Sequence, residues 1–108
     1  MELHSIINPW PFKRSKIDII GKIYSYSSHK YSYILLAMDC FTKWVKAISY
    51  KSITQKTIVK FIEENIIHQF GLPESITTDQ GIIFTGSEVV EFARSRGIKM
   101  VYSTPYYP

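Results

Sequence analysis

The stretch YSYILLAMDCFTKWVKAISY, residues 31–50, decides the fold. Its first half, Tyr31–Cys40, is almost continuously apolar, as expected of a central strand that is covered on both faces. A tight connection leads into a second β-rich run, Trp44–Tyr50. Upstream, Ile17–Tyr24 (IDIIGKIY) is also rich in β-branched and aromatic residues, and the polar turn at 25–30 follows it. Three strands with short links predict an antiparallel meander.

After this meander the hydrophobic period changes from that of a strand to that of a helix. Between residues 54 and 70 the apolar side chains recur with helical spacing and form one stripe, which predicts an amphipathic helix. A short strand at 74–78, a second helix at 87–96 and a fifth strand at 98–102 follow. Strands that are reached through helices run parallel to a neighbour by right-handed crossovers. The predicted fold is therefore α/β, with a mixed sheet of five strands, three antiparallel and then two parallel.

Capping residues mark the ends of both predicted helices. Thr54 is suited to the N-cap of the first helix, because its hydroxyl can accept from a backbone N–H, and Gly71 ends that helix. For the second helix we expect a capping box formed by Thr85 and Glu88, and Gly97 at the end.

Composition sets broad limits on what the chain does. Its 108 residues support one domain, and 45% hydrophobic against 20% charged residues excludes a disordered chain. The net charge of +4 leans toward a polyanionic partner. Cys40 is the only cysteine, so no internal disulfide forms, and we expect it to be a small core residue. No run is long and apolar enough for a membrane span or a signal peptide, so we expect a soluble, intracellular protein.

Four segments carry a family resemblance that spans nearly the whole chain. They are PWPFKRSKIDIIG (9–21), YILLAMDCFTKWVKAI (33–48), FGLPESITTDQGIIF (70–84) and GIKMVYSTPYYP (97–108). Together, and in this order, they resemble the integrase catalytic core of gypsy-type LTR retrotransposons, a family related to retroviral integrases. The resemblance implies a ribonuclease H-like fold. By this interpretation residues 1–14 are an irregular lead-in and 15–108 are part of a catalytic core, without the C-terminal helices that would cover apolar surface on one face of the sheet.

The resemblance also implies a metal site made of carboxylates. Asp18 matches the family's first catalytic aspartate and Asp79, within Thr78-Asp79-Gln80-Gly81, matches the second. In the family these residues and a glutamate hold two Mg²⁺ (or Mn²⁺) ions for phosphoryl transfer, a chemistry that uses ions about 3.5–4 Å apart. The matching glutamate would fall beyond Pro108. We therefore expect an incomplete two-ion site and a chain that is inactive alone.

Each acidic residue also has a purely structural interpretation. An aspartate at a strand end shortly before a glycine, as Asp79 is before Gly81, serves more often as a turn residue than as a ligand. Asp18 lies inside a strand, where a carboxylate needs a partner or a metal. Asp39 matches a non-catalytic position of the family, so we expect a turn or cap role for it.

Two functions remain open at this stage. The first is DNA integration, by 3′-end processing and strand transfer, and the second is a non-catalytic remnant that binds nucleic acid or associates with itself. The expected partners are DNA (element ends and target) and further copies of the chain, with no membrane and no small-molecule substrate, and a nuclear location fits the family. We assign nucleic-acid contacts to the residues beside the second aspartate and in the last segment: Gln80, Gly81, Ser103, Thr104, Tyr106 and Tyr107.

Overall fold

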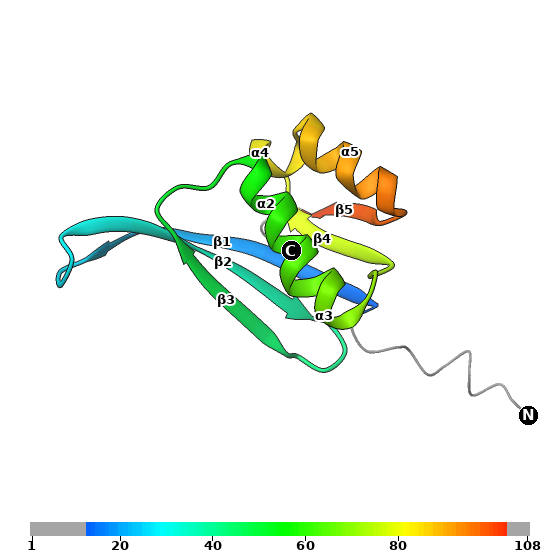
Figure 1. Ribbon diagram of the computed structural model, residues 1–108, viewed down its shortest axis with the longest axis horizontal. Coiled ribbons are helices and arrows are strands. Elements are labelled where there is room, and N and C mark those ends of the chain that lie inside the picture. The colour runs from blue at the N-terminus through cyan, green and yellow to red at the C-terminus, as the bar shows by residue number, and fades with distance from the viewer. Residues whose placement is uncertain (1–12, 104–108) are drawn as a thin grey trace, which may run out of the picture.

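A five-stranded mixed sheet forms the body of the molecule (Figure 1). The computed structural model describes residues 13–103. The strands are β1 (Arg14–Ser25), β2 (Lys30–Asp39), β3 (Val45–Tyr50), β4 (Ser75–Asp79) and β5 (Lys99–Ser103). They lie in the order β3-β2-β1-β4-β5. The meander β1-β2-β3 is antiparallel, and β4 runs parallel to both β1 and β5. The predicted fold class is confirmed.

The helical segments connect the strands on one side of this sheet. They are α2 (Gln55–Ile62), the π-helical η1 (Glu63–Ile67), α3 (His68–Phe70), α4 (Ile82–Thr85) and α5 (Ser87–Arg96). The first three together occupy the predicted helix, which has Thr54 as its N-cap and stops at Gly71. The widened turn of η1 was not predicted, because the apolar stripe runs through it without a break. Within residues 13–103, no helix combines the length and apolarity needed to cross a membrane.

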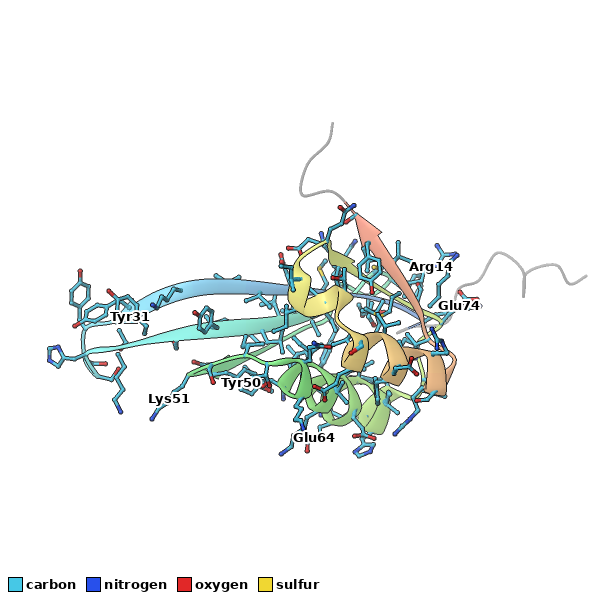
Figure 2. The ribbon with its side chains drawn as sticks, turned by 90° about the horizontal axis from the view of Figure 1, so that it is seen from above. Arg14, Tyr31, Tyr50, Lys51, Glu64 and Glu74 are labelled. Carbon is cyan, nitrogen blue, oxygen red and sulfur yellow. The ribbon has the colours of Figure 1, made fainter. Side chains whose placement is uncertain are left out.

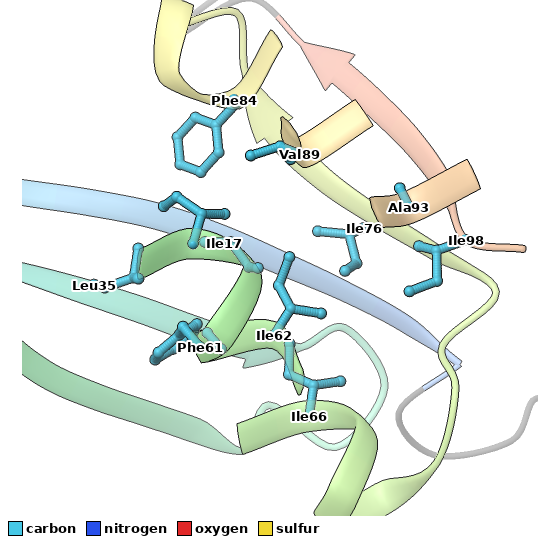
Figure 3. Packing of buried hydrophobic residues seen from close by; sticks show 12 residues of the cluster. Ile17, Leu35, Phe61, Ile62, Ile66, Ile76, Phe84, Val89, Ala93 and Ile98 are labelled. Atoms are coloured by element: carbon cyan, nitrogen blue, oxygen red, sulfur yellow. The ribbon is translucent and has the colours of Figure 1, made fainter. Parts of the chain in front are cut away.

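The hydrophobic core lies between the sheet and these helices (Figure 3). From the sheet, Ile17, Leu35 and Ile76 are at most 1% exposed, and from α2 Phe61 and Ile62 pack against them. Burying side chains of this size stabilises a fold by about 1.5–3 kcal/mol each. Strand alternation then sends the next residues of β1 and β4 to the opposite face of the sheet.

That opposite face carries no helix within the described part of the chain (Figure 2). Apolar side chains on it stay in contact with solvent: Ile20 is 44% and Val45 50% exposed.

Two details of the sequence prediction were wrong. Cys40 is exposed, because β2 ends at Asp39 and Cys40 begins the turn, where its backbone N–H donates to the Arg14 carbonyl. The capping box of Thr85 and Glu88 does not form. Thr85 belongs to the separate short helix α4, where its hydroxyl donates to the Ile82 carbonyl, and Gly86 is the N-cap residue of α5.

Candidate active site

The pairing of β1 with β4 brings the two predicted metal-binding aspartates together. Arg14 pairs with Ser75, Ser15 with Ile76 and Lys16 with Thr77, so each β1 residue faces the residue 61 positions later. Continuing this register by two residues places Asp18 level with Asp79. Paired residues in a sheet point to the same face, so both carboxylates lie on the face opposite the core.

Asp79 is the last residue of β4 and is half-buried. Its Oδ1 accepts a hydrogen bond of 2.7 Å from the backbone N–H of Gly81, which closes a turn of the kind expected at this position. A Cβ on Gly81 would lie 3.0 Å from that same Oδ1. The glycine therefore leaves room for the carboxylate, and the turn holds it at the carboxyl end of the strand.

Asp18 is exposed in the middle of β1, while its neighbour Ile17 is 1% exposed in the core. Its Oδ1 accepts from the backbone N–H of Ile19 at 3.0 Å. Arg14 and Lys16 are also exposed and alternate with it along the strand, so they share its face. The result is an acidic group beside a short row of cations, a surface that suits a phosphate-containing partner.

Asp39 has the turn role predicted for it. It is 1% exposed, and its Oδ2 accepts from the backbone N–H of Thr42 at 2.6 Å and from the Thr42 hydroxyl at 2.7 Å. These bonds stabilise the link between β2 and β3 and account for a buried carboxylate without a metal.

The predicted nucleic-acid contacts divide into two groups. Gln80 and Gly81 are exposed directly after Asp79, and Ser103 is exposed on β5, where it pairs with Asp79. These three therefore gather at the edge where β4 and β5 both end, which is where parallel sheets usually bind ligands. The other three predicted contacts, Thr104, Tyr106 and Tyr107, lie outside the described residues.

Two aromatic residues that sequence reasoning missed fix the loop after Asp79. The backbone N–H of Phe84, which is 2% exposed, donates to the Gly81 carbonyl at 3.0 Å. The Tyr102 hydroxyl on β5 donates to the Phe84 carbonyl at 3.1 Å, and burial raises the pKa of Tyr102 above 10.0. The loop is thus tied to the core and to β5. No local signal in the sequence indicates this contact between residues 18 positions apart.

Within residues 13–103 there is no group of three or more His, Cys, Asp or Glu side chains that could hold a metal ion. The described site is therefore a pair of carboxylates with exposed polar residues around it.

Comparison with known proteins identifies the family. The integrase core domain family matches residues 10–108. The chain belongs to this family. It is 32% identical over 98 residues to the Pro-Pol polyprotein of simian foamy virus type 3 (strain LK3), covering 91% of this chain and 8% of the polyprotein. The integrase core is thus confirmed, and the gypsy-type branch stays a prediction.

Solved structures of integrase cores share this fold. The catalytic core domain of HTLV-2 integrase in complex with magnesium, in its dimeric form, matches with a TM-score of 0.71 and 27% identity, covering 85% of this chain and 61% of that one. A chain of the simian T-cell lymphotropic virus intasome in complex with PP2A regulatory subunit B56 gamma matches with a TM-score of 0.78 and 24% identity, covering 91% of this chain and 34% of that one. The second likeness concerns the fold alone. The chain spans less than a tenth of each of three foamy virus polyproteins that it matches.

Proposed function

We propose that this integrase core acts in DNA integration, by metal-dependent phosphoryl transfer in 3′-end processing and strand transfer. The observation that carries the proposal is the β1–β4 register, which places Asp18 level with Asp79 on the same face of the sheet. Two carboxylates that lie side by side on neighbouring parallel strands are suited to a divalent ion, because Mg²⁺ takes oxygen ligands.

The donor atoms fit such an ion. In each aspartate Oδ1 accepts one backbone N–H, and within residues 13–103 Oδ2 takes part in no hydrogen bond or ion pair. Asp18 and Asp79 would therefore each offer an oxygen to Mg²⁺ or Mn²⁺ while their backbone bonds keep them oriented. The ion, when bound, neutralises charge on a phosphate and lowers the pKa of a coordinated water.

The surrounding residues would bind and orient DNA. Arg14 and Lys16 lie on the same face as Asp18, and their charges attract the phosphate backbone. Gln80, Gly81 and Ser103 present polar groups at the adjacent edge, the last through the register that pairs it with Asp79. Such backbone contacts position a duplex without reading its sequence. DNA and further copies of the chain are thus the proposed partners.

One specific observation favours a second candidate function. The described residues contain two aligned carboxylates and no third ligand, whereas the two-ion mechanism of the family uses an Asp, Asp, Glu set. A site made of this pair alone is expected to hold one ion weakly, because Mg²⁺ binds through one or two carboxylates together with substrate phosphates. The second candidate is therefore a non-catalytic module that binds nucleic acid or associates with itself.

Two measurements on the full 108-residue chain separate these functions. Binding of Mn²⁺, followed by electron paramagnetic resonance, is expected to fall at least about tenfold in Asp18→Asn and in Asp79→Asn, since each loses a charged ligand. Glu91→Gln on α5 removes an exposed carboxylate elsewhere and is the matched control. Equal binding in all four proteins would contradict the metal site.

Strand transfer with a labelled DNA end and Mn²⁺ is the second measurement. Activity that disappears in Asp18→Asn would establish catalysis by this chain and exclude the non-catalytic module. Metal binding that depends on both aspartates, without any strand transfer, would instead support the second candidate.

A further inference from the structure

The β1–β2 hairpin extends well beyond the rest of the molecule (Figure 1). Strand β4 pairs with β1 only at 14–16, and β3 pairs with β2 only at 33–38. The residues of the hairpin from 22 to 32, called here the outer hairpin, therefore pair only with each other among the described strands. An arm of this kind adds little to the core, so its exposed side chains require another explanation.

Three tyrosines cluster on the outer hairpin. Tyr24 pairs with Tyr31 across the two strands, with ring centroids 5.0 Å apart, and Tyr26 meets the Tyr24 ring edge-on at 5.1 Å. The rings nevertheless remain open to solvent, with Tyr26 84% and Tyr31 54% exposed. Figure 2 shows Tyr31 at the end of the arm that lies away from the helices. The cluster holds the three rings together, and Tyr26 keeps most of its ring surface in contact with solvent.

The charge around this cluster has one sign. Between Asp18 and Asp39 the sequence contains no acidic residue, whereas Lys22 and Lys30 lie on the outer hairpin. The Lys22 ammonium sits 4.7 Å from the centre of the Tyr31 ring. At the turn, His29 Nδ1 is 3.2 Å from the Tyr24 hydroxyl. The arm thus combines cations, hydroxyl groups and exposed aromatic faces, without any carboxylate to repel an anion.

We propose that the outer hairpin binds unpaired nucleic acid, with a base stacked on Tyr26 and phosphates held by Lys22 and Lys30. An unpaired strand offers aromatic faces and negative charge in alternation, and this combination matches the arm. In a duplex the base faces are covered by their neighbours, so a duplex would use the lysines alone. This surface is distinct from the carboxylate pair and does not require a metal.

The proposal is tested with a fluorescein-labelled oligothymidylate and the full chain in EDTA, with affinity measured by fluorescence anisotropy. Removing the ring in Tyr26→Ala is expected to weaken binding by about 5- to 150-fold, which corresponds to the 1–3 kcal/mol of one stacked base. Tyr26→Phe keeps the ring and should retain affinity. Phe41→Ala is the control, because Phe41 is an exposed aromatic residue (53%) outside the arm.

The lysines are tested through the salt dependence. For a single strand, the slope of log affinity against log salt changes by about 0.7 for each phosphate that the protein neutralises. Lys22→Ala and Lys30→Ala should each reduce the slope by about that amount, whereas Lys56→Ala on α2 should leave it unchanged. Circular dichroism verifies that every variant is folded.

Two results would overturn the proposal. One is a Tyr26→Ala affinity no weaker than that of Phe41→Ala. The other is that a duplex of equal length binds as tightly as the single strand and that Tyr26→Ala weakens duplex binding equally. The arm would then bind in a groove of double-stranded nucleic acid. Because the assay is metal-free, its outcome is independent of Asp18 and Asp79, and so of the proposed integration chemistry.

Discussion

Gln55 is expected to stabilise helix α5 although it belongs to α2. Its Oε1 accepts from the backbone N–H of Glu88 at 2.8 Å and from that of Val89 at 3.2 Å. These are N–H groups of the first turn of α5, whose N-cap residue, Gly86, has no side chain to satisfy them. Loss of an N-cap interaction typically costs about 0.5–2 kcal/mol. Since two bonds disappear together, we expect Gln55→Ala to cost about 1–2 kcal/mol.

Gly86→Ala probes the same contact from the other side. The backbone of Gly86 (φ −69, ψ 160) suits any residue, so alanine introduces no backbone strain. A Cβ at this position, however, would overlap the side-chain amide of Gln55 and displace it. The variant therefore loses the same two hydrogen bonds as Gln55→Ala. It regains about 0.4–1 kcal/mol, because alanine restricts the unfolded chain more than glycine does.

A double-mutant cycle measures the coupling free energy between Gln55 and Gly86. Once Gln55→Ala has removed the overlapping side chain, adding Gly86→Ala should be neutral or stabilising, and the double variant should be no less stable than Gln55→Ala. The expected coupling is about 1–2 kcal/mol, measured as urea unfolding followed by far-UV circular dichroism. If the losses of unfolding free energy of the two single variants sum to that of the double variant within about 0.5 kcal/mol, the two sites are independent. That result would refute the capping of α5 by Gln55.

Two further predictions concern the site and the pH dependence. Gly81→Ala places a Cβ 3.0 Å from Asp79 Oδ1, so it should weaken Mn²⁺ binding several-fold. The free energy of unfolding should change by no more than about 0.5 kcal/mol. Unchanged Mn²⁺ binding would show that the position of the Asp79 carboxylate does not depend on this turn. Burial, and then the Glu64 carboxylate, raise the pKa of Tyr50 above 10.0 (both residues are labelled in Figure 2). The folded state therefore holds this phenolic proton more tightly than the unfolded chain, and stability should fall as the pH rises past about 10. Tyr50→Phe should make that fall shallower, as measured by urea midpoints at about pH 9 and 11; a slope identical to that of the unmodified chain would contradict the assignment.

The regular elements could be predicted because each satisfies one local rule. The apolar run of β2 and the helical stripe that begins after Thr54 both arise from burial on the same core, which imposes the period of the element on the sequence. The capping role of Thr54 was also predictable, because its hydroxyl bonds to the backbone of Thr57, only three residues away.

The features that escaped prediction depend on residues far apart in the sequence. The cap on α5 comes from Gln55, 33 positions before the Glu88 N–H that it accepts from. Helix α4 has only four residues, too few for any period to appear, and its position is fixed by Tyr102 on β5. The length of the outer hairpin could not be predicted from the sequence for a related reason. Its strands pair only with each other among the described strands, so burial imposes no pattern on them.

The candidate site was partly predictable, because the register between β1 and β4 determines both the core on one face of the sheet and the site on the other. In β1, Ile17 is 1% exposed on the helix side, and in β4 the residue level with it, Thr78, is also 1% exposed. A slip of one residue would exchange the two faces, exposing Ile17 and burying the charge of Asp18 among apolar side chains. The core therefore penalises every register except those that keep Asp18 on the open face. Pairing within β1–β4 then selects the one that aligns it with Asp79. The family resemblance already implied that the two aspartates lie side by side on parallel strands, and packing on the opposite side of the sheet is the physical cause of that alignment.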